Sequence, residues 1–180
     1  MTLRNTTSEY GSVAKFFHWL IFLLLLCMII YGYFLDDLPK DFKSTGYNIH
    51  KLTGLTILTL MLLRLGWALL NPKPVLPFNT PSWQKQGERL VHFLLYITVI
   101  AMPVVGWIGS VASGHAPHIA SIQLELPLEQ SKAIADTAFF LHDKLAIAII
   151  VLVSIHALAA LYHHFIKRDN ILRRMMPHCR

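Results

Sequence analysis

A histidine-bearing apolar segment near the C-terminus contains the residues best suited to chemistry. Residues 140–165 read FLHDKLAIAIIVLVSIHALAALYHHF, long enough to cross a membrane, and include His142 and His156. At about 100° and 1.5 Å per residue, their spacing places both rings within about 40° of one helix face and about 21 Å apart. A polar ring at membrane depth costs a few kcal/mol. Both histidines are therefore candidates for function, at two different depths.

Histidines elsewhere in the chain can meet these two at matching depths. His50 begins a second apolar run at the same side as His142, and His18 lies near the opposite side, level with His156. Two pairs are predicted, His50 with His142 and His18 with His156, each drawn from two helices. His92, at the depth of His18, is an alternative partner for His156, and depth alone does not separate the two.

Paired imidazoles inside an apolar bundle suit the iron of a haem. The macrocycle is apolar enough for a helical core, and the iron takes one imidazole on each face. Zinc would need three or four ligands close together, whereas these histidines are separated into twos. Cys27 and Cys179 form neither CxxC nor CxxCH, which excludes covalently attached c-type haem. Two non-covalent, bis-histidine b haems are therefore expected, one with iron bound by His50 and His142 and one with iron bound by His156 and either His18 or His92.

Cationic side chains near these histidines could bind the haem carboxylates. Arg64 returns to nearly the same helix face as His50 at the depth of the other pair, where a charge needs a partner such as a propionate. An arginine that reaches the headgroups is the alternative. Lys51 and Lys144 lie beside His50 and His142 in the sequence. They could meet the propionates of a haem held there or face the lipid headgroups.

Further residues on the same helix faces extend the pattern. His163 follows His156 by two turns on almost the same face, where its ring could donate a hydrogen bond to a quinone carbonyl or a propionate. His164 is turned away and has no assigned role. Gly32 and Gly54 could let a macrocycle approach the backbone, although glycine is also common where membrane helices pack.

Helices that cross a membrane must position these residues. The 180-residue chain is 54% hydrophobic and 14% charged, with a mean hydropathy of +0.50, which indicates a polytopic membrane protein. Four apolar segments of about 20 residues or more, each able to span a hydrocarbon core of about 30 Å, are expected at 16–35, 48–70, 90–112 and 139–166. The connection 113–138 is the longest, with a helix-like stretch near LEQSKAIADTAFF. The fold expected for residues 1–180 is one all-α membrane domain, a four-helix bundle.

Lysine and arginine are distributed unequally between the two sides of this bundle. One side, which includes both termini, carries most of them: Arg4, Lys15, Arg64, Lys73, Lys85, Arg89, Lys167, Arg168, Arg173, Arg174 and Arg180. The other side carries Lys40, Lys43, Lys51, Lys132 and Lys144. By the positive-inside rule, the N- and C-termini are expected in the cytoplasm. Because the basic residues flank apolar segments and form no basic face, no nucleic-acid partner is expected.

Short motifs in order along the chain give a family resemblance. HW at His18, IHKLTG from Ile49, the Arg64 position, LVHFLLYITVIAMPVVG, FLHDKLA, SIHALAALYHHF and the terminal RDNILRRMMP occur across nearly the whole chain. Together they resemble the bacterial cytochrome b561 family, which is related to the b-type cytochrome subunit of nickel–iron hydrogenases. No single motif is specific, but their order across four helices is.

The resemblance implies a ligand set and an activity. It assigns His18 and His156 to an inner haem and His50 and His142 to an outer haem, and leaves His92 as a second-shell or quinone-site residue. It also implies respiratory electron transfer with membrane quinone, and superoxide as a candidate electron donor.

The expected function is thus a di-haem b-type cytochrome of the bacterial inner membrane. Electrons would enter at the periplasmic face from a small molecule or protein and reach ubiquinone near His163, with superoxide:ubiquinone oxidoreductase as one form of this activity. Leu145, Ile149 and Leu152 are expected between the haems. An alternative is a haem-b membrane anchor that transfers electrons for a separate dehydrogenase or periplasmic donor. A transporter with histidine relays would belong to another class, and four spans without evident inverted repeats disfavour it.

Overall fold

Four long apolar helices dominate the computed structural model, which describes residues 2–77 and 80–176. They are α1 (Ser12–Tyr33), α2 (Lys40–Leu70), α3 (Ser82–Ala112) and α4 (Lys132–Tyr162), and α4 continues as a π-helical turn, His163–Lys167. Each is long and apolar enough to cross a membrane. The predicted all-α architecture with four spans is confirmed.

The helices begin earlier than the hydropathy predicts. α2 starts at Lys40 rather than 48, directly after Pro39, and α3 starts at Ser82 rather than 90, directly after Pro81. α4 starts at Lys132 rather than 139, because the Ser131 hydroxyl caps it by accepting from the Ile134 amide at 3.5 Å. Hydropathy marks the part of a helix that lipid can surround, whereas prolines and caps mark its first turn.

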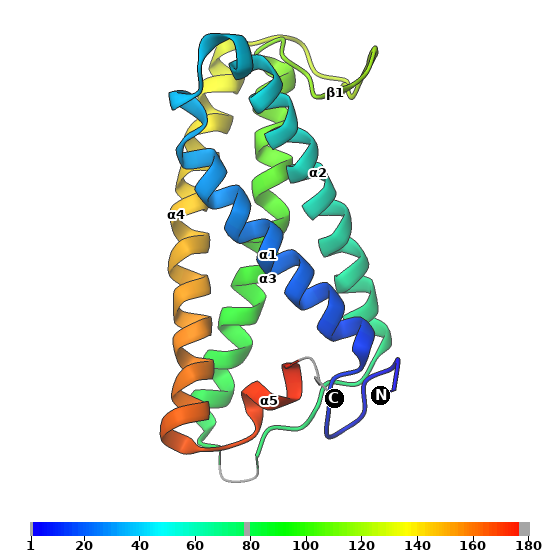
Figure 1. Ribbon diagram of the computed structural model, residues 1–180, viewed down its shortest axis with the longest axis vertical. Coiled ribbons are helices and arrows are strands. Elements are labelled where there is room, and N and C mark those ends of the chain that lie inside the picture. The colour runs from blue at the N-terminus through cyan, green and yellow to red at the C-terminus, as the bar shows by residue number, and fades with distance from the viewer. Residues whose placement is uncertain (1, 78–79, 177–180) are drawn as a thin grey trace.

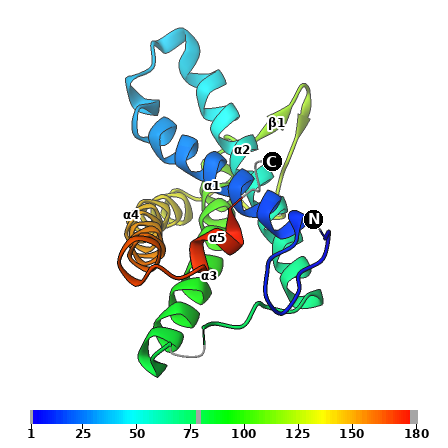
Figure 2. The same cartoon turned by 60° about the horizontal axis from the view of Figure 1, so that its bottom comes forward.

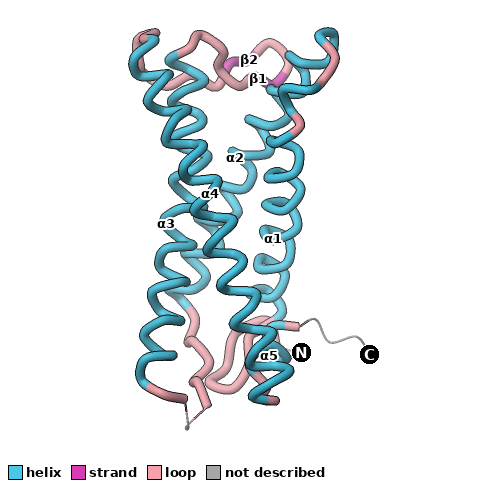
Figure 3. Tube along the Cα trace, turned by 90° about the vertical axis from the view of Figure 1, so that its left-hand side faces the viewer, coloured by secondary structure: helices cyan, strands magenta, loops and turns pink. Residues whose placement is uncertain are grey.

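Successive helices run antiparallel along one long axis (Figures 1 and 3). One end of the bundle, here called the hairpin end, carries the 3-10 turn η1 (Leu35–Asp37) and a small antiparallel hairpin of β1 (His118–Ile119) and β2 (Ile122–Gln123). Asn48 holds this hairpin to α2, since its side chain donates to the His118 carbonyl at 2.9 Å and accepts from the His118 amide at 3.0 Å. The predicted long connection 113–138 is therefore partly this hairpin and partly the first turns of α4.

The opposite end, here called the terminal end, carries residues 2–11 and the short helix α5 (Ile171–Met175). Figure 2 shows α5 folded back across this end, between α4 and α1. The Trp19 indole donates to the Met175 carbonyl at 2.9 Å, and Arg174 Nη1 donates to the Val75 carbonyl at 2.5 Å. These bonds connect the end of the chain to α1 and to the segment after α2.

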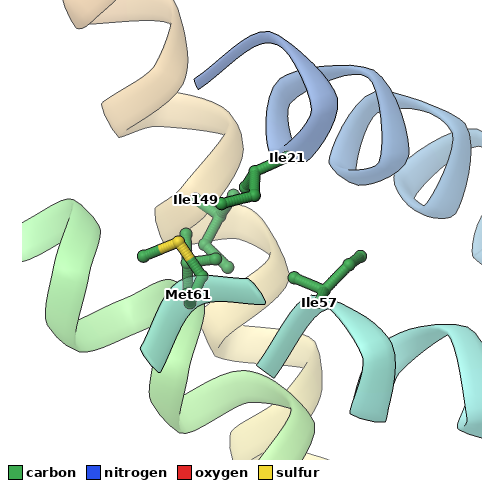
Figure 4. Close-up of a cluster of buried hydrophobic side chains, with 5 residues drawn as sticks. Ile21, Ile57, Met61 and Ile149 are labelled. Atoms are coloured by element: carbon green, nitrogen blue, oxygen red, sulfur yellow. The ribbon is translucent and has the colours of Figure 1, made fainter. Parts of the chain in front are cut away.

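A small apolar core lies halfway along the bundle. Ile21, Ile57, Met61 and Ile149, shown in Figure 4, pack together with Val99, and Ile149 has no exposed surface. Most other apolar side chains point outward; Leu23 and Leu158, for example, are 57% and 65% exposed. In water such exposure would be unfavourable, so it indicates a lipid-facing surface.

Candidate functional site

Two histidines meet inside the bundle near its hairpin end. The rings of His50, from α2, and His142, from α4, have centroids 6.2 Å apart with an interplanar angle of 66°. Tyr31 of α1 stacks on His50 at 6.2 Å, and its hydroxyl donates to the Gly46 carbonyl at 3.2 Å. The predicted juxtaposition of His50 and His142 is present, and Tyr31 restricts the tilt of one ring.

Hydrogen bonding orients the His142 ring. His142 Nδ1 lies 3.1 Å from the Met102 carbonyl, an acceptor, so Nδ1 carries the hydrogen. Nε2 then keeps a free lone pair, which is the usual arrangement in a metal-ligating histidine. On the facing ring, His50 Nδ1 is buried without a hydrogen-bond partner within the described chain. Both rings are thus suited to a ligand between them.

Two glycines give these rings their room. A Cβ built on Gly32 would lie 3.1 Å from His50 Cε1, and one on Gly106 would lie 2.9 Å from His142 Nδ1. Gly54, by contrast, approaches only Pro103 Cβ, at 3.8 Å. The adjoining cavity is almost wholly apolar and is lined by Leu25, Met28, Ile29, His50, Gly54, Ile57, Val99, Met102, Pro103 and His142. Gly106 was not singled out by the sequence, because no spacing rule relates it to a histidine on another helix.

Three histidines gather near the terminal end. His156 of α4 lies 6.1 Å from His18 of α1 and 5.1 Å from His92 of α3, measured between ring centroids. The sequence predicted that these three histidines lie at the same depth, and the structure brings their rings together. His92 Nδ1 is bound to Glu88, at 2.9 Å from both the Glu88 carbonyl and Oε1, and Lys73 also binds Glu88 at 2.5 Å. The His92 ring is therefore fixed by its own helix.

Arg64 lies beside this cluster, where the sequence predicts it. Its Nη2 donates to His18 Nδ1 at 3.2 Å, and its guanidinium lies 5.9 Å from the centroid of the Tyr96 ring. With Nδ1 as acceptor, the hydrogen of His18 is on Nε2. Coordination through Nε2 would require Arg64 to move away from Nδ1, and an anionic group beside it would favour that movement.

The remaining predicted residues make other contacts. His163 Nδ1 pairs with Asp169 Oδ2 at 2.5 Å, across the turn that leads into α5. His164 Nδ1 is buried without a partner in the described part of the chain. At the hairpin end, Lys51 donates to the His115 carbonyl at 2.6 Å and Lys144 lies 5.1 Å over the Phe140 ring. The sequence did not identify Asp169, a single carboxylate without periodic neighbours.

Between the two histidine pairs the bundle is apolar. Ile149 lies midway between His142 and His156 in sequence and is fully buried, as predicted for the gap. Leu145 and Leu152 are half-buried, and Val153 packs against the central cluster. This layer separates the pairs and keeps water from the middle of the bundle.

The donor set fits haem better than zinc. Among residues 2–77 and 80–176, no group of three or more histidine, cysteine or acidic side chains is placed to hold a metal ion. Zinc would need such a group. Two facing imidazoles with apolar walls between helices are instead what a bis-histidine haem requires.

The chain is similar to known proteins over almost its whole length. Residues 9–178 match the family described as prokaryotic cytochrome b561. Cytochrome b561 homolog 2 of Escherichia coli (strain K12) is 29% identical over 180 residues, covering 98% of this chain and 95% of the relative. Cytochrome b561 homolog 1 of the same organism is also 29% identical, covering 94% and 98%. The probable superoxide oxidase CybB of Yersinia pestis is 30% identical over 171 residues, covering 94% and 96%.

Proposed function

We propose a di-haem electron-transfer function for this chain, which belongs to the prokaryotic cytochrome b561 family and is a membrane cytochrome of the b type. His50 and His142 would hold one haem b, and His18 and His156 the other. Electrons would pass from the hairpin end to the terminal end and reduce ubiquinone in the inner membrane. Superoxide is the candidate donor, because one relative is named a probable superoxide oxidase.

The near-equal separation of the two histidine pairs carries this proposal. With metal–nitrogen distances of about 2 Å, two imidazoles on opposite faces of one metal have ring centroids about 6 Å apart. The observed separations are 6.2 Å for His50 with His142 and 6.1 Å for His18 with His156. His92 lies 5.1 Å from His156, too close for that arrangement. The geometry therefore favours His18 over His92, in agreement with the resemblance.

The chain's own residues would control each haem site. Haem b, when bound, supplies a one-electron redox couple at each depth. The Met102 carbonyl fixes the His142 tautomer, and Ile149 and its neighbours keep the layer between the sites dry. Arg64 would turn from His18 toward a propionate. His92, held by Glu88, would restrict the position of the His156 ring, 5.1 Å away.

The direction of transfer follows from the charge distribution. The arginine-rich terminal end would face the cytoplasm by the positive-inside rule, and the hairpin end would face the periplasm. Two superoxide ions would each lose one electron to become O₂, and one ubiquinone would take both electrons with two protons from the terminal end. His163 and His92 are the candidates for the quinone site, and Asp169 would hold the His163 ring in place.

A reduced-minus-oxidised visible spectrum with haem stoichiometry tests the proposal. The purified chain should contain two b haems, and His142→Ala and His156→Ala should each retain one, because each removes one axial ligand. His118→Ala is the matched control, since His118 is exposed on the hairpin and bonds only through its backbone. Absence of haem bands, or two haems retained in His156→Ala, would refute the assignment.

A second candidate is an anchor subunit that transfers electrons for a separate donor protein. The hairpin end favours it in one respect, because the hairpin presents Ile119 and Ile122 to solvent, 58% and 67% exposed. The haem sites would be the same in both cases. Superoxide added to the purified chain with ubiquinone separates them, because quinol forms without a partner only if the chain acts alone.

A further inference from the structure

Arg174 on α5 has a buried donor without a partner. Its Nη1 donates to the Val75 carbonyl at 2.5 Å, but its Nε is buried and has no hydrogen-bond partner within the described residues. The adjacent Arg173 is exposed. A buried donor left unpaired costs about 1–3 kcal/mol, and more when the group is charged. The position of Arg174 therefore suggests an acceptor for its Nε.

The described chain provides no carboxylate for this guanidinium. Glu88 is already shared by Lys73 and His92, and Asp169 is bound to His163. No acidic side chain among residues 2–77 and 80–176 forms an ion pair with Arg64 or Arg174. Two partly buried arginines at the terminal end thus lack an acidic side chain of their own.

Tyr10 does not supply the missing negative charge. Burial raises the pKa of the Tyr10 phenol, and Glu88 raises it further, while Arg64 and Arg174 oppose the rise. The phenol therefore stays neutral at physiological pH. Because both arginines act electrostatically on this one residue, they also lie on the same side of the molecule, around the start of α1.

α5 is bonded to α1 at Trp19, the residue that follows His18. The Met175 carbonyl accepts from the Trp19 indole at 2.9 Å, and the Trp19 ring lies 5.4 Å from the His18 ring. Arg64 Nη2 lies 3.2 Å from His18 Nδ1. The backbone beside Arg174 is thereby held to Trp19, the residue after His18, by a hydrogen bond that involves no charge.

We propose that Arg174 binds a carboxylate of the haem held by His18 and His156, so that α5 forms part of that site. The inference rests on the proposed function. Haem b has two propionates, and the terminal end offers two partly buried arginines, Arg64 and Arg174, without an acidic partner among the described residues. Arginine Nε and Nη donors match a carboxylate geometrically, and a charge-assisted bond is stronger than a neutral one. A lipid phosphate is the other anion that could reach this end of the bundle.

Haem exchange in the purified holoprotein tests the assignment. Arg174→Gln and its matched control Arg173→Gln would each be mixed with excess apomyoglobin, and haem release followed by absorbance. We expect one of the two haems to leave Arg174→Gln about tenfold faster than wild type, as a charged hydrogen bond of about 1.5 kcal/mol implies. Arg173→Gln should release both haems at the wild-type rates.

A second measurement separates carboxylate binding from a structural role. Wild type and Arg174→Gln would be stripped of haem and reconstituted with protohaem or with its dimethyl ester, which has no free carboxylates. The difference between the two proteins should disappear with the ester. Equal release rates with protohaem, an equal difference with both haems, or a difference that appears only with phosphatidylglycerol present would overturn the proposal. Failure of wild type to bind two haems would instead reject the proposed function.

Discussion

Residues without functional groups shape the hairpin-end histidine pair. Gly32 and Gly106 lie against the His50 and His142 rings so closely that a methyl group on either would press on an imidazole. The His142 ring cannot easily retreat, because it is bonded to the Met102 carbonyl. The positions of the two rings are therefore limited by glycines on α1 and α3, helices that carry neither histidine of the pair, and by a backbone carbonyl.

Gly106→Ala should weaken binding of the haem proposed between His50 and His142. The added Cβ would lie 2.9 Å from His142 Nδ1, and overpacking of this kind costs about 1–3 kcal/mol. We expect the variant to release one haem about tenfold faster than wild type, or to be purified with one haem per chain. The pyridine haemochrome assay, applied to samples taken over time, measures the haem content in both cases. Gly66→Ala is the control, since its Cβ would meet nothing within 4 Å. Equal haem retention in the two variants would show that the glycine contact is not important.

At the scale of elements, one carboxylate connects α4 to α5. Asp169 Oδ2 pairs with His163, and Asp169 Oδ1 accepts from the Ile171 amide at 3.0 Å, in the first turn of α5. Arg168, just before it, adopts the left-handed conformation with φ 53°, which reverses the chain. The π-helical end of α4, this turn and Asp169 together direct α5 back toward His18.

Asp169→Ala should loosen α5 while leaving the four spans intact. Loss of the hydrogen bond to the Ile171 amide and of the pair with His163 removes about 1 kcal/mol or more, so the amides of residues 171–176 should exchange hydrogen about fivefold faster. Lys167→Ala, an exposed position in the same turn, should exchange like wild type. Asp169→Asn keeps an acceptor for Ile171 and should fall between them. Unchanged exchange in Asp169→Ala would show that the bonds of Met175 to Trp19 and of Arg174 to Val75 fix α5 without Asp169.

Sequence periodicity could predict the elements and the histidine pairs but not the contacts that tune them. The interval between His142 and His156 depends only on helix geometry, so the depths of the pairs followed directly from it. His18 and His92 could not be separated in that way, because which of two helices approaches His156 depends on packing. Gly106 and Asp169 were missed for the same reason, since their partners lie on another helix or beyond a turn.

At the scale of the whole molecule, the hairpin end has more acidic than basic residues. It has five lysines, Lys40, Lys43, Lys51, Lys132 and Lys144, but seven carboxylates: Asp36, Asp37, Asp41, Glu125, Glu129, Asp136 and Asp143. The terminal end has the opposite balance. Haem propionates at the hairpin end would add negative charge. An anionic donor approaching that end would therefore meet a field that repels it overall, although Lys51 and Lys144 lie closest in sequence to the His50 and His142 pair.

Salt dependence shows which of these charges governs access. The charges of the hairpin end act on an approaching anion only within about one Debye length. This length shrinks from about 30 Å at 0.01 M to about 8 Å at 0.15 M salt, so added salt weakens the effect of the more distant charges. Net repulsion predicts that haem reduction by superoxide becomes faster as salt is added, measured by stopped flow. Glu125→Lys with Glu129→Lys, both exposed positions, should raise the rate at low salt and reverse the trend. A wild-type rate that falls several-fold with salt would instead mean that Lys51 and Lys144 attract superoxide locally despite the acidic surroundings.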